Sequence, residues 1–253
     1  MQKYILECCV DSVESAINAA NGGASRLELC SNLIIGGTTP DVALVKEIRK
    51  YTDIRMHALI RPRFGDFCYT AHEMEIMKTQ IRALKEAGVE GIVIGVLDEN
   101  GNLDIPKMQE LLQEAKGLSV TLHRAFDMCR DPFQALDEAI QLGINTILTS
   151  GQKSSAWEGR ELLAELIKRA DGRIDIMAGA GVGASVIETL ISVTGGTSYH
   201  MSGKITLDSP MVYRKSDVSM GLPSLSEYEI WQTSESAVKQ AVEVLRKADK
   251  KRD

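Results

Sequence analysis

Acidic residues and cysteines alternate within the first two apolar runs of the chain. Glu7 and Cys9 alternate in the first run, and Glu28 and Cys30 do so in the second. With the two-residue period of a strand, each Glu–Cys pair shares one face. A charge inside an apolar strand is costly unless it is paired, so Arg26 and Glu28 are compatible with an ion-pair network or with a functional site. The position of Glu7 near the strand end favours a functional role.

Two arginines flank a proline after the third apolar run, in the sequence Arg61-Pro62-Arg63. Because proline restricts the backbone, we expect the two guanidinium groups to form a clamp for a carboxylate or a phosphate. Asp66, three residues further on, is a candidate acid or base beside them. The alternative is structural: either arginine bridges a neighbouring acid, such as Glu28 or Asp66.

A histidine and an aspartate follow the fifth apolar run, four residues apart. His123 and Asp127 span a predicted strand-to-loop junction, where they are candidates for an oriented acid/base pair. The alternative for His123 is a buried residue with a purely structural role.

Glycines alternate after the seventh apolar run, at Gly179, Gly181 and Gly183, just before a predicted helix near Ser185. A glycine-rich loop that leads into a helix N-terminus presents backbone N–H groups to anions, and we expect Ser202 to add its hydroxyl to the same phosphate site. A tight turn that binds no ligand is the alternative.

The elements that must position these residues repeat as a short apolar run followed by an amphipathic helix. Eight such units, spaced by ~30 residues, predict a single-domain α/β fold of the (β/α)8 TIM-barrel type. The predicted strands are Tyr4–Cys9, Arg26–Cys30, Ile54–Ile60, Gly91–Val96, Ser119–His123, Thr146–Thr149, Ile174–Ala178 and Ser198–Met201. An irregular segment, about 203–227, is predicted to cross or cover an end of the barrel, and a C-terminal helix is predicted at about 228–250.

A doubly wound open sheet is the alternative fold, although its dinucleotide fingerprint is missing after the first run. In a TIM barrel the carboxyl ends of the strands form the functional end, which we call the mouth. We therefore expect one group of side chains to gather there: Glu7, Glu28, Arg61, Arg63, His123, Asp127 and Ser150.

Composition restricts the classes of partner. The 253 residues carry a formal net charge of −6, which argues against a nucleic-acid partner. Neither a spanning apolar stretch nor a signal peptide is recognisable in the sequence. The five cysteines form an odd set, which is typical of free thiols in the cytoplasm rather than of a disulfide framework. The sequence leaves assembly into a homo-oligomer open.

Five ordered motifs give the chain a family resemblance. They are Glu28-Leu29-Cys30 with Gly36–Pro40, Ile60–Phe67, His123–Asp127, Leu148–Gly151 and His200-Met201-Ser202. From Ile5 to about Ser219 the chain resembles the CutC copper homeostasis family. The resemblance implies a cytoplasmic TIM barrel that binds copper(I) through cysteines at the ends of the first two strands, positions that match Cys9 and Cys30.

Neighbouring parallel strands lie about 4.8 Å apart, so we expect Cys9 and Cys30, at equivalent strand ends, to reach one ion. Thiolates select copper(I) over harder ions, whereas Cys8 is expected to point into the helix layer. The alternative is that Cys9 and Cys30 are small buried apolar residues. At strand eight, Met201 replaces a family cysteine and offers at most a thioether.

Two functions follow from these patterns. The first is a copper(I)-binding homeostasis protein. The second is a TIM-barrel enzyme of unknown reaction that acts on a small anionic or phosphorylated substrate. Two arginines, a glutamate and a histidine exceed what a copper carrier needs, and they favour the enzyme.

Overall fold

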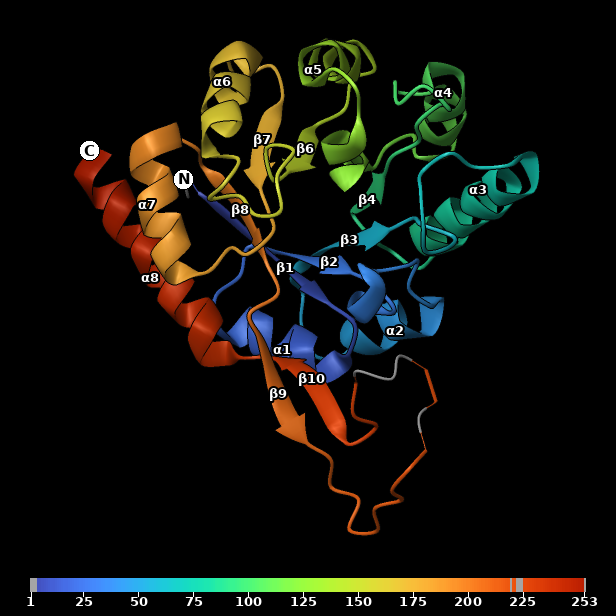
Figure 1. Ribbon diagram of the computed structural model, residues 1–253, viewed down its shortest axis with the longest axis vertical. Helices are drawn as coiled ribbons and strands as arrows, with labels where there is room; N and C mark the ends of the chain where they lie inside the picture. The colour runs from blue at the N-terminus through green and yellow to red at the C-terminus, as the bar shows by residue number, and fades with distance from the viewer. Residues whose placement is uncertain (1–3, 219, 222–224, 253) are drawn as a thin grey trace.

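Eight parallel strands form a closed barrel in the computed structural model, which describes residues 4–218, 220–221 and 225–252 (Figure 1). Each strand pairs with the next, and the last pairs with the first, so the sheet has no edge. The predicted (β/α)8 barrel is confirmed, and the open-sheet alternative is excluded. The strands are β1 Ile5–Val10, β2 Arg26–Leu29, β3 Arg55–Leu59, β4 Gly91–Ile94, β5 Ser119–Leu122, β6 Thr146–Thr149, β7 Asp175–Ala178 and β8 Ser198–Met201.

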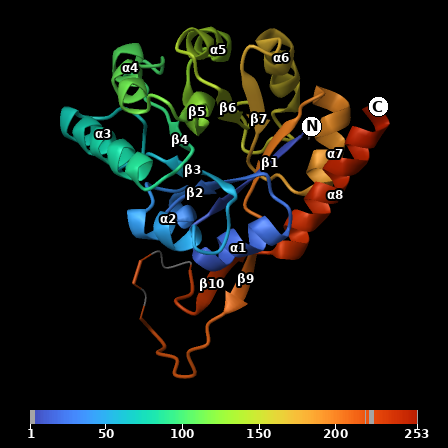
Figure 2. The same cartoon turned by 180° about the vertical axis from the view of Figure 1, so that it is seen from behind.

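Helices surround the barrel on the outside (Figures 1 and 2). Several begin at a residue whose side chain accepts a backbone N–H, as Ser12, Asp41 and Thr70 do, and these caps mark where each loop ends. Two short 3₁₀ helices, η1 Leu33–Ile35 and η2 Arg124–Met128, follow β2 and β5. The α-helices are α1 Val13–Asn21, α2 Val42–Ile48, α3 Ala71–Glu86, α4 Ile105–Glu114, α5 Pro132–Gln141, α6 Arg160–Ala170, α7 Ala184–Thr194 and α8 Glu235–Arg252.

The strands bury two different faces. The outward face is apolar: Leu6, Cys8 and Val10 of β1 belong to the large core that also contains the buried helix residues. Cys8 thus lies on the helix side, as expected. The inward face carries charged and polar side chains instead, among them Glu7 and His57, which are fully buried. The ionisable side chains of these strands therefore lie inside the barrel.

The C-terminal part differs from the prediction. The helix expected from 228 begins at Glu235, because Glu229–Thr233 forms a strand, β10, that pairs antiparallel with β9 (Lys204–Asp208). The Lys204 ammonium also lies 3.1 Å from the centre of the Trp231 ring. The pairing shortens the irregular segment to 209–228, of which residues 219 and 222–224 lie outside the described residues.

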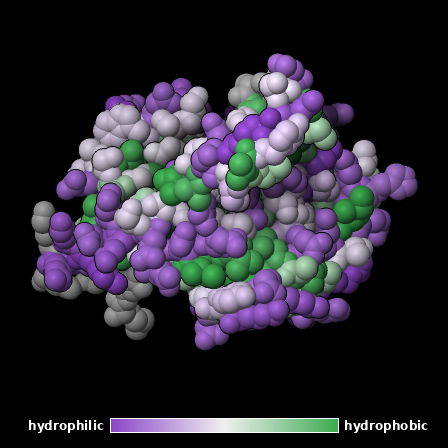
Figure 3. All heavy atoms as spheres, turned by 90° about the horizontal axis from the view of Figure 1, so that it is seen from below, coloured by the Kyte–Doolittle hydropathy of each residue, from purple (hydrophilic) through white to green (hydrophobic). Residues whose placement is uncertain are grey.

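The ribbon of β9 and β10 extends beside α1 (Figure 1), and residues at its base line the cavity at one end of the barrel. Asn18 of α1 donates to the Thr233 carbonyl at 2.9 Å, which fixes the base of the ribbon. Apolar side chains such as Ile205, Leu207 and Ile230 are exposed on it. Figure 3, which views the molecule from the ribbon's side, shows apolar areas divided by polar surface. Among the helices that the structure describes, none is both long enough and apolar enough to span a bilayer.

Candidate metal and ligand site in the barrel mouth

A buried ionic network closes the barrel between its first and last strands. Glu7 lies opposite Arg26 of β2 and opposite His200 of β8 in the strand register. Its carboxylate pairs with Arg26 at 2.5 Å and contacts His200 Nδ1 at 2.8 Å. Burial opposes ionisation of Glu7, but these two neighbours more than offset it and lower its pKa to about 2. Glu7 is therefore ionised, and its contacts hold β1 to β2 and β8.

Glu28 lies nearer the mouth than Glu7 does. Its carboxylate is 3.7 Å from His200 Nε2 and 3.5 Å from the Cys30 sulfur. Burial raises the pKa of Glu28 to about 7. The sequence favoured Glu7 as the functional acid and left Glu28 open, and the structure reverses that ranking: Glu7 is enclosed in ion pairs, whereas Glu28 lines a cavity.

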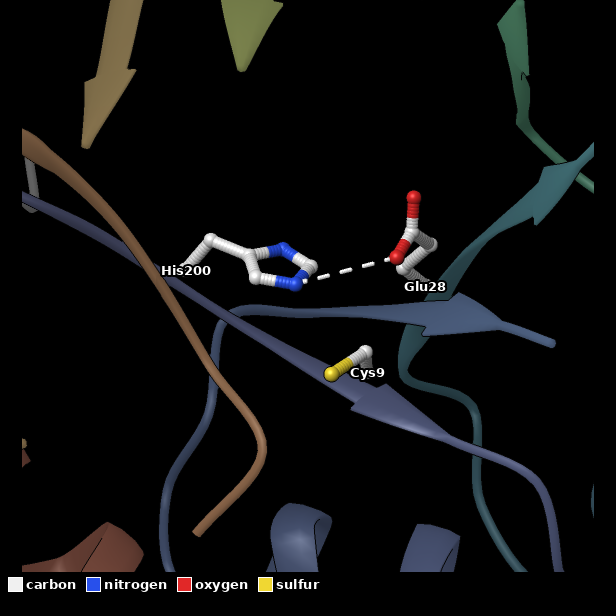
Figure 4. Close-up of side chains that lie close together, drawn as sticks. All are labelled: Cys9, Glu28 and His200. Atoms are coloured by element: carbon white, nitrogen blue, oxygen red, sulfur yellow. Dashed lines mark ion pairs between the residues drawn. The ribbon is translucent and has the colours of Figure 1, made fainter. Parts of the chain in front are cut away.

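His200 is held between the two carboxylates. Burial alone would lower its pKa, but the adjacent Cys9 and both acids raise it well above the ordinary value. Sulfur, nitrogen and oxygen atoms of Cys9, His200 and Glu28 all lie within 4.8 Å of one another. Figure 4 shows these three side chains converging from β1, β8 and β2. Together they form a potential metal-binding group.

Cys30 is offset from this group. The register pairs Cys9 with Glu28, so Cys30 lies two residues beyond Cys9 instead of at the equivalent strand end. The expected alignment was wrong because β1 and β2 end together at Val10 and Leu29, so that Cys9 lies one residue before the end of β1 whereas Cys30 lies one residue after the end of β2. Cys30 packs against Leu59 and Val93, and burial together with the neighbouring Glu28 raises the pKa of its thiol well above the ordinary value.

A cavity of about 340 Å³ opens at the mouth, and we call it the mouth cavity. Six of the predicted site residues line it: Cys9, Glu28, Arg61, His123, Gly181 and Ser202. The remaining lining residues are Asp11, Ser15, Leu33, Gly36, Leu59, Phe67, Arg124, Leu148, Ala180, Val182, His200, Met201, Lys204, Trp231, Gln232 and Thr233.

The two arginines around Pro62 do not form a clamp. The chain bends at residues 63–65, so that Arg61 is buried in the mouth while Arg63 lies outside it. Arg63 pairs with Asp66 at 2.9 Å and with Glu73 of α3 at 2.5 Å. The prediction of a shared anion clamp was therefore wrong, and Arg63 and Asp66 hold the loop to α3.

The predicted acid/base pair of His123 and Asp127 also does not form. The 3₁₀ helix η2 turns Asp127 toward the end of β6, where it accepts hydrogen bonds from Thr149 and Ser150 and pairs with Arg124 at 2.6 Å. His123 Nδ1 instead accepts the Ala125 backbone N–H at 3.1 Å. Asp127 thus holds the segment after β5 to the end of β6, and His123 does not pair with it.

The glycine-rich loop contributes to the mouth cavity only in part. Gly181 and Ser202 line it, but the Gly179 N–H donates to the Thr149 carbonyl at 2.9 Å. That hydrogen bond continues the pairing of β6 with β7, so Gly179 has no N–H to offer an anion. Gly183, the N-cap of α7, lies outside the cavity lining.

His200 is the residue that the sequence interpretation missed. The four histidines show no metal-ligand spacing along the chain, and the group forms only because β8 returns to pair with β1. One signal was available: in β8 and directly after it, the polar Ser198, His200 and Ser202 recur every second residue, which is the pattern of a polar inward face.

Fold and site together define a TIM barrel whose mouth holds a buried set of thiol, imidazole, carboxylate and guanidinium groups. The CutC family model matches residues 4–205. A CutC family protein from Parabacteroides distasonis is 46% identical over 239 residues, which cover 94% of this chain and 98% of the relative. The chain belongs to the CutC family.

Two further relatives agree with this assignment. The copper homeostasis protein cutC homolog of Homo sapiens is 44% identical and is matched over 93% of this chain and 87% of its own. The crystal structure of CutC from Streptococcus agalactiae superposes with a TM-score of 0.75 at 31% identity, covering 79% of this chain and 98% of that one.

Proposed function

We propose that this protein acts in copper homeostasis by binding copper(I) in the mouth cavity through Cys9 and His200, with Cys30 as a second thiolate. The relatives' names support the copper role. The convergence of Cys9 and His200 supports the location. The reducing cytoplasm is the proposed compartment, since all five cysteines are free.

The contact of Glu7 with His200 carries this proposal. Because Glu7 is an ionised acceptor 2.8 Å from Nδ1, that nitrogen is the donor, and Nε2 is the atom turned toward Cys9 and Glu28. A carboxylate behind a histidine is the usual second contact of a metal-binding imidazole, because it fixes the tautomer and strengthens the ligand. Nε2 is then the nitrogen that faces an ion, and because the raised pKa of His200 keeps a proton there, copper(I) must displace that proton to bind.

The donor set fits copper(I) better than a harder cation. Thiolate and imidazole are soft to intermediate ligands, and copper(I) accepts two or three of them. The Cys9 thiol is only partly buried and lines the cavity, so an ion can reach it from solvent. The carboxylate of Glu28 is a hard donor, and we assign it no direct bond to copper.

Copper(I) affinity tests the proposal directly. The protein is titrated anaerobically against a chromogenic copper(I) chelator, and the dissociation constant is compared for the parent, Cys9→Ser and His200→Gln. We expect tight binding of one ion by the parent and at least a tenfold loss in each variant, since even second contacts of a metal ligand are worth about 10- to 100-fold.

Cys8→Ser is the matched control, since Cys8 adjoins Cys9 but lies in the outer core. Its affinity should equal that of the parent. Cys30→Ser decides the coordination: a further loss indicates two thiolates, and unchanged affinity indicates Cys9 and His200 alone. Weak binding by the parent, or unchanged binding by both Cys9→Ser and His200→Gln, would refute the proposal.

A further inference from the structure

Arg61 is a buried cation that has no acidic partner among the residues that the structure describes. Its exposed fraction is 8%, and its guanidinium donates only to backbone carbonyls, among them Gly37 at 3.0 Å and Gly65 at 3.0 Å. No carboxylate of the described residues pairs with it, and its Nε has no hydrogen-bond partner there. Buried charges are normally neutralised by a counter-charge. Arg61 therefore lacks the anion that would balance it.

The other cations that line the mouth cavity, Arg124 and Lys204, already have partners. Arg124 pairs with Asp127, and the ammonium of Lys204 lies over the Trp231 ring in the exposed ribbon. Arg61 differs from them because it combines deep burial, an unpaired charge and a position in the cavity wall.

His123 supplies an unused hydrogen-bond donor in the same cavity. Its Nδ1 accepts the Ala125 N–H, so in the neutral ring the proton lies on Nε2. Burial, assisted by the charge of Arg61, lowers the pKa of His123 to about 3, which keeps the ring neutral. Within the part of the chain that the structure describes, Nε2 has no partner, although the exposed fraction of His123 is only 5%.

The fold brings these two groups to one side of the mouth. Arg61 follows β3 and His123 follows β5, and the residue after β4 between them is Gly95. A Cβ at Gly95 would lie 2.6 Å from the His123 ring, so only glycine leaves room for the imidazole there. The Phe67 ring contacts both groups, with its centre 4.9 Å from the His123 ring and 5.1 Å from the Arg61 guanidinium carbon.

We propose that Arg61 and His123 form a binding site for the oxyanion of a small anionic metabolite, a phosphate ester or a carboxylate, in the mouth cavity. The guanidinium supplies the balancing charge and the His123 Nε2–H supplies a directed hydrogen bond. A volume of about 340 Å³ is in the range of small-molecule sites. This site is independent of copper(I) and goes beyond the proposed function.

Anion titration of the metal-free protein tests this site. Inorganic phosphate and succinate are titrated separately at constant ionic strength, with chloride as the balancing salt, and binding is followed by calorimetry. We expect saturable binding of at least one anion by the parent. Arg61→Gln and His123→Phe should each weaken it at least tenfold, since each removes a charge-assisted hydrogen bond to the anion. Which anion binds identifies the ligand as a phosphate or a carboxylate.

Arg63→Gln is the matched control, since Arg63 is two residues away and its charge is already paired. It should bind the anion within about twofold of the parent, because exposed charges contribute little. A second measurement needs no variant: the ¹⁵N and ¹H signals of His123 Nε2–H should shift on anion binding. Absence of saturable binding by both anions in the parent, equal affinity in all variants, or an unmoved Nε2–H signal on binding would each overturn the site.

Discussion

Glu7 and His200 are joined at 2.8 Å across the seam where β8 meets β1. The Glu7 side chain is fully buried, that of His200 is 12% exposed, and Arg26 completes the network from β2. The contact therefore has two roles: it joins the first and last strands of the barrel, and it orients the imidazole that faces the mouth cavity.

Removal of the Glu7 carboxylate should destabilise the protein strongly. Glu7→Ala leaves the buried Arg26 without its ion-pair partner and leaves His200 with Glu28 alone, and a broken buried pair costs about 3–5 kcal/mol. Urea unfolding measures the loss. Glu47→Ala removes a surface carboxylate that pairs with Lys50, and it should change stability little. Similar losses in the two variants would show that the network does not hold the barrel closed.

Gly91 of β4 should tolerate no side chain while His57 is present. A Cβ at Gly91 would lie 2.5 Å from the His57 ring. Gly91→Ala should therefore cost about 1–3 kcal/mol through overpacking. In the double variant with His57→Ala the two losses should be less than additive. Gly183→Ala, where nothing lies within 4 Å, is the control. Additive losses in thermal unfolding would contradict the proposed contact.

Acid should weaken the fold partly through His57. Burial, with the charge of Arg26, lowers the pKa of His57 to about 4, below the ordinary 6.5. Between these values the unfolded chain binds a proton that the folded chain does not, so stability falls as the pH falls, by about 1.4 kcal/mol per pH unit.

Glu28, whose pKa is raised, changes the stability in the opposite direction over this pH range. The contribution of His57 is therefore measured by comparing variants. His57→Gln should lose stability less steeply than the parent between pH 6.5 and 4, as measured by urea unfolding. The exposed His72 provides the control, and His72→Gln should follow the parent. If His57→Gln also follows the parent, His57 does not resist protonation.

The cysteines should react with iodoacetamide in an order set by burial. The thiolate is the reactive form, and burial raises the pKa of Cys129 to about 12. Cys9 and Cys68 are partly exposed and should be alkylated first, whereas Cys8, Cys30 and Cys129 should be protected until the protein unfolds. Mass spectrometry of timed samples checks the order. Early modification of Cys30 would contradict its enclosed position.

The barrel could be predicted from the sequence because its signals are local. Apolar runs and amphipathic periods recur eight times, and each depends on residues close together in the chain. The ribbon was missed because β9 and β10 are short and pair across a long segment. Glu229–Thr233 was predicted as the start of the helix that in fact begins at Glu235.

For the site, the sequence could predict which residues take part but not which residues they contact. The positions of Cys9, Glu28, Arg61 and His123 near strand ends indicated the mouth, and all four line the cavity. Their partners depend on register and on loop bends, which no local pattern encodes. The outward turn of Arg63, the offset of Cys30 and the arrival of His200 beside Glu7 all arise in this way.

The seam between β1 and β8 also sets the order in which this chain can fold. Glu7 and His200 are 193 positions apart, so nearly the whole chain must leave the ribosome before the contact can form. Until then the edge of β1 is unpaired and one partner of its buried carboxylate is missing. Long-range closure of this kind slows folding and exposes aggregation-prone strand edges. Strand β8 thus closes the barrel and places the His200 imidazole at the mouth cavity in a single late event.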